Sequence, residues 1–121
     1  RYPLVARVCA ACLLVQVETE AALANIEAIC EVEGIDGVFI GPADLHASMG
    51  YTGEIANPKV KPLIDEAIRR IRRCGRAPGI LTPNEADARH WLECGALFVA
   101  VGADVGILAR GADALAAKFK P

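Results

Sequence analysis

Two carboxylates occupy positions where a parallel α/β protein places its reactive groups. Glu18 directly follows the apolar run Leu13–Val17, and Asp44 follows the apolar run Gly37–Ile40 after a short turn. If both runs are parallel strands, their carboxyl ends meet at one edge of the sheet, and the two carboxylates become neighbours. Two hard oxygen ligands suit Mg²⁺ or Mn²⁺, with positions left for water and a chelating substrate. An acid/base pair in which only one member is ionised is a second interpretation.

Both carboxylates also have structural interpretations. Glu18 precedes a segment of helical period and would then cap that helix, with its carboxylate near the positive end of the helix dipole. Asp44 follows Pro42 and would then be an ordinary turn residue. The small residues Gly41–Ala43 would let backbone N–H groups approach an anion, although Gly-Pro is also a common turn. Gln16 is a stronger indication, because an amide inside an apolar strand must find hydrogen-bond partners, which favours a substrate contact near Glu18.

The other chemically active side chains permit ordinary interpretations. His46 lies two residues after Asp44 and could be a base or a third ligand, although a single histidine in a loop is more often a surface residue. Basic residues crowd the end of one helical segment, where they could bind an anionic partner. More simply, they complement the helix C-terminal dipole and form a solvated face. These residues are Arg69, Arg70, Arg72, Arg73 and Arg76.

The five cysteines are odd in number and lie within apolar segments, which is typical of reduced thiols in a reducing compartment. Cys9 and Cys12 have the spacing of a redox or zinc motif, but no second pair accompanies them. Neither His46 nor His90 stands at zinc-finger spacing from them. We therefore expect buried small side chains at these two positions.

Four continuous apolar runs predict strands that are covered on both faces. They are Leu13–Val17, Gly37–Ile40, Ala77–Leu81 and Leu97–Val101. Segments of helical period follow at 19–31, at about 61–74, from 83 towards Gly95, and from near Asp104 towards Phe119. For the third helix, Thr82 is the expected N-cap, with Pro83 and Glu85 in its first turn. Strand and helix repeated four times predict a parallel sheet with right-handed crossovers.

Four such units make either half of a (β/α)₈ barrel or a small open doubly wound sheet. The turn after the first strand, residues 17–20, lacks the glycine-rich pattern of a phosphate-binding loop, which weighs against nucleotide binding. The 121 residues carry 13 basic and 15 acidic side chains, a net charge of −2, with 54% hydrophobic and 5% aromatic residues. This composition predicts one globular domain, or a piece of one, and disfavours nucleic acid as a partner.

No apolar stretch approaches the roughly 20 residues that span a bilayer, and no signal-peptide pattern opens the sequence. We therefore expect a cytoplasmic protein without a membrane partner. The first residue is Arg1 rather than Met, which suggests a segment of a longer protein.

Five blocks of the sequence together resemble the HpcH/HpaI family of class II aldolases. They are residues 14–19, 34–45, 49–50, 77–81 and 97–102, of which the second, with Gly-Val-Phe-Ile-Gly-Pro-Ala-Asp-Leu, is the most specific. The resemblance implies a TIM barrel of the phosphoenolpyruvate/pyruvate superfamily. Residues 1–121 would then be a single partial domain of about four βα units, the C-terminal half of that barrel.

The resemblance also implies a reaction and its site. Glu18 and Asp44 match the family's two metal ligands, for Mg²⁺ or Mn²⁺, with Co²⁺ as a further option. The substrate contacts fall on Gln16, on Ala43 and Asp44 with the nearby backbone, and on Leu81. The implied reaction cleaves a 4-hydroxy-2-oxo acid to pyruvate and an aldehyde. The metal chelates the substrate and stabilises the charge on the enolate oxygen, without a Schiff-base lysine.

The family's general base, a histidine, and its enolate-binding arginine come from earlier strands. Neither His46 nor His90 matches that base, so the catalytic groups are expected outside this chain. A half-barrel would expose apolar surface, which predicts a homo-oligomer or pairing with the missing N-terminal half. Two alternatives remain: a citrate-lyase β-type lyase that acts on coenzyme A thioesters, and a truncated, non-catalytic half-barrel.

Overall fold

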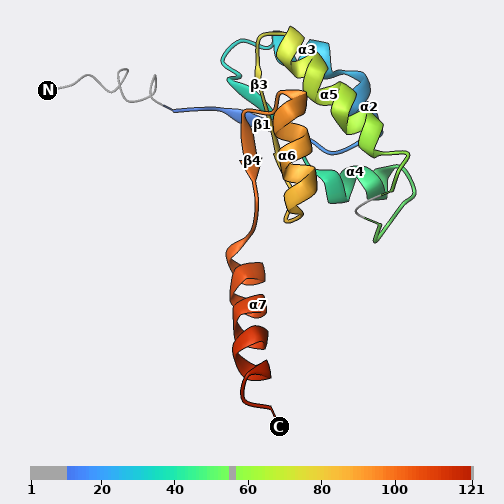
Figure 1. Cartoon of the computed structure of the whole chain (residues 1–121). Helices are drawn as coiled ribbons and strands as arrows, with labels where there is room; N and C mark the ends of the chain where they lie inside the picture. The colour runs from blue at the N-terminus through green and yellow to red at the C-terminus, as the bar shows by residue number, and fades with distance from the viewer. Residues whose placement is uncertain (1–10, 55–56, 121) are drawn as a thin grey trace, which may run out of the picture.

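The chain folds as strands that alternate with helices (Figure 1). The computed structural model describes residues 11–54 and 57–120. Its strands are β1 (Leu14–Val17), β2 (Gly37–Ile40), β3 (Ala77–Leu81) and β4 (Phe98–Ala100). Its helices are α2 (Glu20–Ala24), α3 (Ile26–Glu31), α4 (Pro42–Ser48), α5 (Lys61–Arg73), α6 (Glu85–Cys94) and α7 (Asp104–Ala117).

The four strands form one parallel sheet in the order β1-β2-β3-β4. This order confirms the predicted α/β class and the predicted succession of βα units. The first helical segment is divided at Asn25, whose side-chain Nδ2 donates a hydrogen bond of 2.8 Å to the Ala21 carbonyl. Asn25 ends α2 and begins α3, because a short polar side chain competes with the helix for backbone partners.

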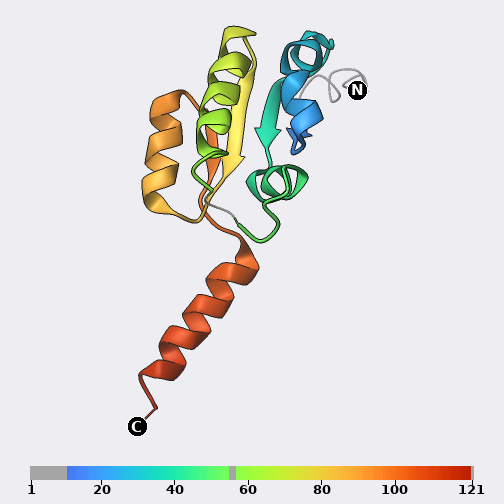
Figure 2. The same ribbon diagram turned by 90° about the vertical axis from the view of Figure 1, so that its right-hand side faces the viewer.

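The helices α3, α5 and α6 cover one face of the sheet (Figures 1 and 2). The side chains of Val17, Val38, Ile40 and Ile80 on that face are fully buried. They pack against the apolar stripe of α5, which is formed by Ile64, Ala67, Ile68 and Ile71. Burial of this stripe is the main contribution to holding the sheet and the helix layer together.

No helix of the described residues covers the opposite face of the sheet. In-register pairing places Gln16, Phe39, Gly79 and Phe98 in one row across it. The rings of Phe39 and Phe98 lie 5.7 Å apart, and Phe98 is 52% exposed. The expectation of strands covered on both faces is therefore wrong for this structure, although both faces are indeed largely apolar. We call this surface the open face.

Two arginines bind the helix layer rather than solvent. The Arg70 guanidinium donates to both carboxylate oxygens of Glu27 and, at 2.9 Å, to the Leu23 carbonyl. Arg76 Nε donates to the Cys30 carbonyl at 2.8 Å. The interpretation of the basic run as a uniformly solvated face is therefore wrong at these two positions, where the side chains tie α5 and the start of β3 to α2 and α3.

The last helix, α7, extends away from the sheet (Figures 1 and 2), and none of its residues is buried. It begins at Asp104, and Ala103 occupies the N-cap position. Within the described ranges, no helix is long and apolar enough to cross a membrane.

The cysteines differ from the buried pair that was expected. Cys12 is exposed, and Cys9 lies outside the described residues. Cys30 is buried, and this burial, together with the neighbouring Cys74, raises the pKa of its thiol to about 11. Cys30 therefore remains a protonated, apolar filler at neutral pH.

Candidate functional site

The carboxyl end of β1 carries two polar side chains on the open face. Successive residues of a strand point to opposite faces, so Gln16 and Glu18 project to the same side. Gln16 Nε2 donates a hydrogen bond of 2.8 Å to Glu18 Oε2. Glu18 therefore supplies the hydrogen-bond partner that we expected for the Gln16 amide, although Gln16 is exposed on the open face and not buried.

Gly41 makes room for this pair. Val17 of β1 pairs with Ile40 of β2. Gly41, the residue after Ile40, therefore lies beside Glu18, the residue after Val17, at the strand ends. A Cβ atom at Gly41 would lie 2.8 Å from Glu18 Oε2 and 2.9 Å from Gln16 Nε2. These distances are shorter than van der Waals contact. The Glu18 carboxylate and the Gln16 amide therefore occupy space that any side chain at Gly41 would need.

Asp44 lies in the first turn of α4, which begins directly after Gly41. Its side chain is exposed, and its place within a helix means that the turn interpretation is wrong. Ser48 fixes the orientation of α4, because its Oγ accepts a hydrogen bond of 3.2 Å from the Glu20 N–H and donates one of 2.9 Å to the Leu45 carbonyl. This contact ties the helix that carries Asp44 to the segment that follows Glu18.

Glu18 is not needed to cap the helix after it. Thr19 is the N-cap of α2, and its side chain accepts a hydrogen bond of 3.1 Å from the Ala22 N–H. The capping interpretation of Glu18 is therefore wrong. Its carboxylate is directed instead towards Gln16 and the backbone of Gly41.

A cavity of about 210 Å³ lies next to these strand ends. Its walls include Ala43 from α4 and Leu81 at the end of β3, two of the predicted substrate contacts. The other lining residues are Pro42, Thr82, Pro83, Asn84, Asp87 and Trp91. Gln16, Glu18 and Asp44 are absent from the cavity wall. The predicted site is thus arranged in two parts, a polar one over Gly41 and a mostly apolar one beside Ala43.

His46 is a structural residue. It is 2% exposed, and its Nδ1–H donates a hydrogen bond of 2.6 Å to the Pro42 carbonyl. Its Nε2 accepts one of 3.2 Å from the Asn57 N–H, so both ring nitrogens are occupied. The surface interpretation is therefore wrong, and a role as base or metal ligand would require His46 to lose one of these contacts.

The helix predicted from residue 83, which is α6, begins later than predicted, at Glu85. Asn84 is its N-cap and accepts a hydrogen bond of 3.0 Å from the Asp87 N–H. Thr82 is buried, and its Oγ1 accepts one of 3.2 Å from the Asn84 N–H. Thr82 therefore shapes the turn that enters the helix, and the cap itself belongs to Asn84.

A second group of potential ligands lies between α5 and α6. Asp65, His90 and Cys94 each offer one ligand atom within 4.8 Å of the others. Burial raises the pKa of the Cys94 thiol, and the Asp65 carboxylate adds to this effect. The i, i+4 spacing in the sequence indicates that His90 and Cys94 share one face of a helix. Nothing in the sequence indicated Asp65 as their neighbour.

Both the sequence and the structure of this chain are similar to those of known proteins. The sequence profile of the HpcH/HpaI aldolase/citrate lyase family matches residues 6–111. A 4-hydroxy-2-oxo-heptane-1,7-dioate aldolase of Salmonella paratyphi B is 59% identical over 110 residues, which are 91% of this chain and 42% of that protein.

Solved structures agree with the sequence match. An HpcH/HpaI aldolase/citrate lyase family protein from Burkholderia cenocepacia superimposes with a TM-score of 0.85 at 32% identity, over 93% of this chain and 44% of the other. An HpcH/HpaI aldolase from Desulfitobacterium hafniense gives 0.80 at 30% identity, over 96% and 46%. The chain thus spans less than half the length of these relatives. With a family profile that covers most of its residues, the chain belongs to the HpcH/HpaI aldolase/citrate lyase family.

Proposed function

We propose that this chain supplies the metal-binding and pyruvate-binding part of a class II aldolase, which cleaves a 4-hydroxy-2-oxo acid to pyruvate and an aldehyde. The observation that carries the proposal is the Gln16–Glu18 pair lying over Gly41 at the strand ends, with Asp44 in the helix that begins there. The 59% identity to a 4-hydroxy-2-oxo-heptane-1,7-dioate aldolase supports the same reaction class.

The residues at this position fit a divalent metal ion. Glu18 and Asp44 would hold it, since both offer hard carboxylate oxygens and belong to neighbouring βα units. The missing side chain at Gly41 leaves the Glu18 carboxylate free of a steric neighbour on that side. A bound Mg²⁺, Mn²⁺ or Co²⁺ would supply a fixed positive charge opposite the oxygens of a 2-oxo acid.

The remaining residues would position the substrate. Gln16 donates to one Glu18 oxygen, which orients that carboxylate and leaves its other oxygen available. Ala43 and Leu81 border the cavity of about 210 Å³, where small and apolar walls suit the methyl end of pyruvate. His46 takes no part in proton transfer under this proposal, because Pro42 and Asn57 occupy both of its nitrogens.

A Mn²⁺ titration followed by electron paramagnetic resonance tests the proposal. The protein should bind Mn²⁺, and oxalate, a mimic of the pyruvate enolate, should tighten the binding. Glu18→Gln and Asp44→Asn should each weaken Mn²⁺ binding by at least about tenfold. Glu20→Gln is the matched control, because it removes an exposed carboxylate from the adjacent helix and should leave the affinity unchanged.

Mn²⁺ binding that is insensitive to oxalate and to both site variants would overturn the proposal. Pyruvate release from 4-hydroxy-2-oxo acids, coupled to lactate dehydrogenase, is the accompanying assay. Binding without turnover by this chain alone would support the view that its proton-transfer groups are supplied by another segment or another chain.

A further inference from the structure

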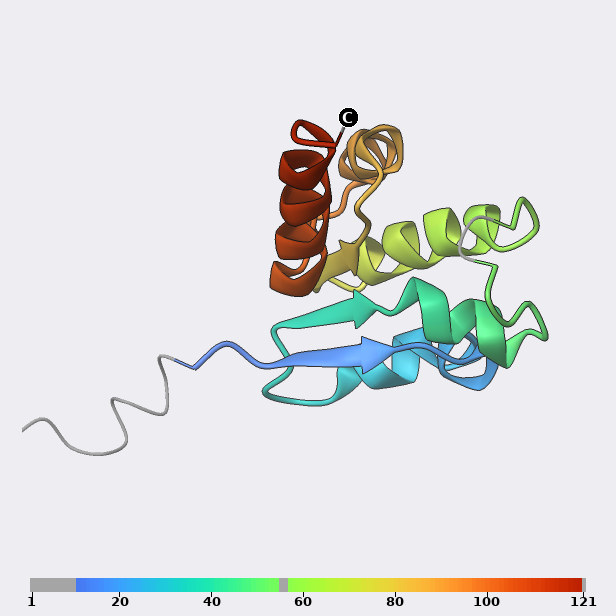
Figure 3. The same ribbon diagram turned by 90° about the horizontal axis from the view of Figure 1, so that it is seen from below.

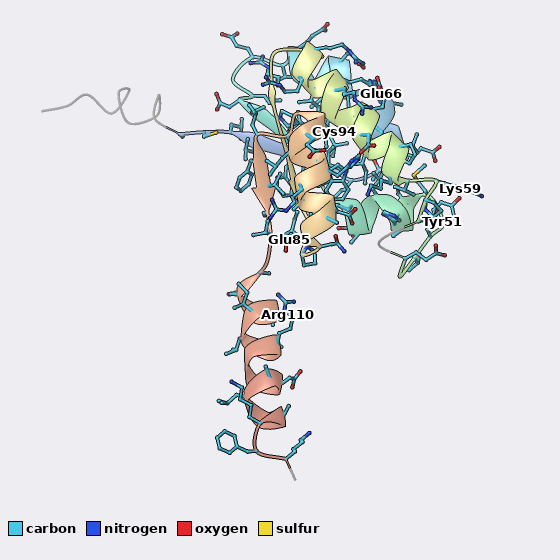
Figure 4. All side chains as sticks on the ribbon, in the orientation of Figure 1. Tyr51, Lys59, Glu66, Glu85, Cys94 and Arg110 are labelled. Atoms are coloured by element: carbon cyan, nitrogen blue, oxygen red, sulfur yellow. The ribbon has the colours of Figure 1, made fainter. Side chains whose placement is uncertain are left out.

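We propose that Asp65, His90 and Cys94 form a Zn²⁺ site that bridges α5 and α6, with its fourth position left to water. The three residues are separate from the proposed aldolase site, because they lie in the outer helix layer and not at the carboxyl ends of the strands. Figure 4 shows Cys94 at the end of α6, beside α5.

The spacing of the donor atoms already approaches that of a tetrahedral site. Zinc bond lengths require about 3.6 Å between a nitrogen and a sulfur ligand and about 3.4 Å between a nitrogen and an oxygen ligand. His90 Nε2 lies 3.6 Å from Cys94 Sγ and 2.9 Å from each Asp65 oxygen. The nitrogen–sulfur distance already fits, and the nitrogen–oxygen distance must lengthen by about 0.5 Å, a movement that rotation of the Asp65 side chain would supply.

The fold presents these groups in a defined arrangement. His90 and Cys94 are four residues apart, so they occupy the same face of α6. The Asp65 side chain is 15% exposed and that of His90 is 37% exposed, which leaves one side open to water. Trp91 Nε1 donates a hydrogen bond of 3.1 Å to Asp65 Oδ1 and orients the carboxylate, as an outer partner of a metal ligand commonly does.

The donor set selects the kind of metal. One nitrogen, one thiolate sulfur and one carboxylate oxygen suit Zn²⁺ and disfavour Mg²⁺ or Ca²⁺, which require oxygen ligands. Without a metal, His90 Nε2–H donates to Asp65. Coordination replaces that proton, so the neutral imidazole carries its proton on Nδ1, and the Cys94 thiol releases its proton to solvent. The Arg69 guanidinium, 3.7 Å from Cys94 Sγ, favours the resulting thiolate.

Titration of the protein with Co²⁺, followed by displacement with Zn²⁺, tests the proposal. A thiolate ligand gives Co²⁺ an intense sulfur-to-metal charge-transfer band in the near ultraviolet, and an oxygen-only site such as Glu18 and Asp44 does not. The band should rise to a plateau, disappear on addition of Zn²⁺, and be lost in Cys94→Ser. Cys74→Ser is the matched control, because it removes an exposed thiol elsewhere and should leave the band intact.

His90→Gln and Asp65→Asn keep the thiol and should each weaken Zn²⁺ binding by at least about tenfold. These variants keep the test valid if Cys94→Ser fails to fold, which far-ultraviolet circular dichroism would reveal. Absence of the charge-transfer band in the native protein would overturn the proposal. So would a band that persists in Cys94→Ser, or Zn²⁺ affinity that is unchanged in both His90→Gln and Asp65→Asn.

Discussion

Gly41 is the residue on which the geometry of the proposed aldolase site depends most directly. Its φ of −95° is accessible to any residue, so the backbone conformation does not demand glycine. The demand comes from Glu18 and Gln16, whose polar atoms lie where a Cβ would be. A methyl group at this position would therefore displace the side chains of Glu18 and Gln16 and leave the backbone conformation unchanged.

Replacement of Gly41 by alanine should weaken Mn²⁺ binding about tenfold, because the new Cβ displaces the Glu18 carboxylate or breaks its hydrogen bond with Gln16. Isothermal titration of both proteins with Mn²⁺ measures the effect. Gly111→Ala is the control, since a Cβ at Gly111 meets nothing within 4 Å, and its affinity should equal that of the native protein. Equal affinities for all three proteins would show that Gly41 is dispensable.

Residue types and spacing indicated Gln16, Glu18 and Asp44, because polar side chains within or shortly after apolar runs are conspicuous. They could not indicate the role of His46, whose partners Pro42 and Asn57 come from the start of its own helix and from a later loop. A single polar residue in a sequence does not reveal whether its hydrogen bonds will be made to water or to the protein. The assignment of Glu18 and Asp44 as metal ligands stays a prediction until a metal titration is made.

At the scale of the elements, the contact of α2 and α3 with α5 is electrostatic as well as apolar. Arg70 lowers the pKa of the Glu27 carboxyl from its ordinary value of 4.5 to about 2, through a side-chain hydrogen bond and the opposite charge. A carboxyl whose pKa is lower in the folded state stabilises the fold above its unfolded pKa. That contribution is lost as the pH falls from about 4.5 to about 2.

Thermal unfolding followed at several pH values should show this dependence. The native protein should lose more of its melting temperature between pH 4.5 and pH 2 than Glu27→Gln, which has no carboxylate to protonate at this contact. Glu31→Gln, an exposed carboxylate variant on the same helix, should follow the native curve. Both variants remove one exposed carboxylate from α3, and only Glu27→Gln removes the partner of Arg70, so identical curves for both would refute the role of the ion pair.

Element types were more predictable than their exact ends. Thr82 and Asn84 are both good N-cap residues, and the sequence contains both within three positions of the third helix. Only the folded chain decides between them, because burial of Thr82 leaves Asn84 at the helix start. The division at Asn25 follows the same rule, since a local side-chain hydrogen bond is too short-ranged to appear in hydrophobic periodicity.

At the scale of the whole molecule, apolar side chains remain uncovered on the open face and on α7. In Figure 3, where β1 and β2 lie across the view, no segment of the described chain passes in front of these two strands, and no residue of α7 is buried. The exposed side chains on α7 include Val105, Leu108 and Leu115, which recur at helical spacing. Exposed apolar stripes of this kind mark surfaces that associate with other chains.

Self-association of the chain should therefore depend on α7. The double substitution Leu108→Asp and Leu115→Asp should weaken association by at least about tenfold, as measured by sedimentation velocity, because it places charge on the apolar stripe. Ala114→Asp adds a single negative charge to the helix beside the stripe and should have a smaller effect than either Leu108→Asp or Leu115→Asp alone. Unchanged association in the double variant would contradict a role for α7 and would leave the open face of the sheet as the expected contact surface.

The parallel sheet and its strand order were predictable because continuous apolar runs separated by helical segments leave few topologies. The apolar pattern alone did not predict the exposure of one sheet face, since buried and exposed apolar runs look alike in a sequence, whereas the half-barrel implied by the family resemblance did predict exposed apolar surface. Phe39 and Phe98 illustrate this, because both look like core residues and yet Phe98 is half exposed.

The residues of the proposed aldolase site lie close together in the sequence, which has a consequence for how the site could be inherited. Gln16, Glu18, Gly41 and Asp44 all fall within one uninterrupted stretch that ends with α4, and Ser48 closes that stretch onto its own beginning. A recombination event that exchanged this stretch between two related genes would transfer the carboxylates, the amide and the glycine together. Natural or engineered chimeras would in this way inherit the proposed metal site as a unit while other segments of the protein vary.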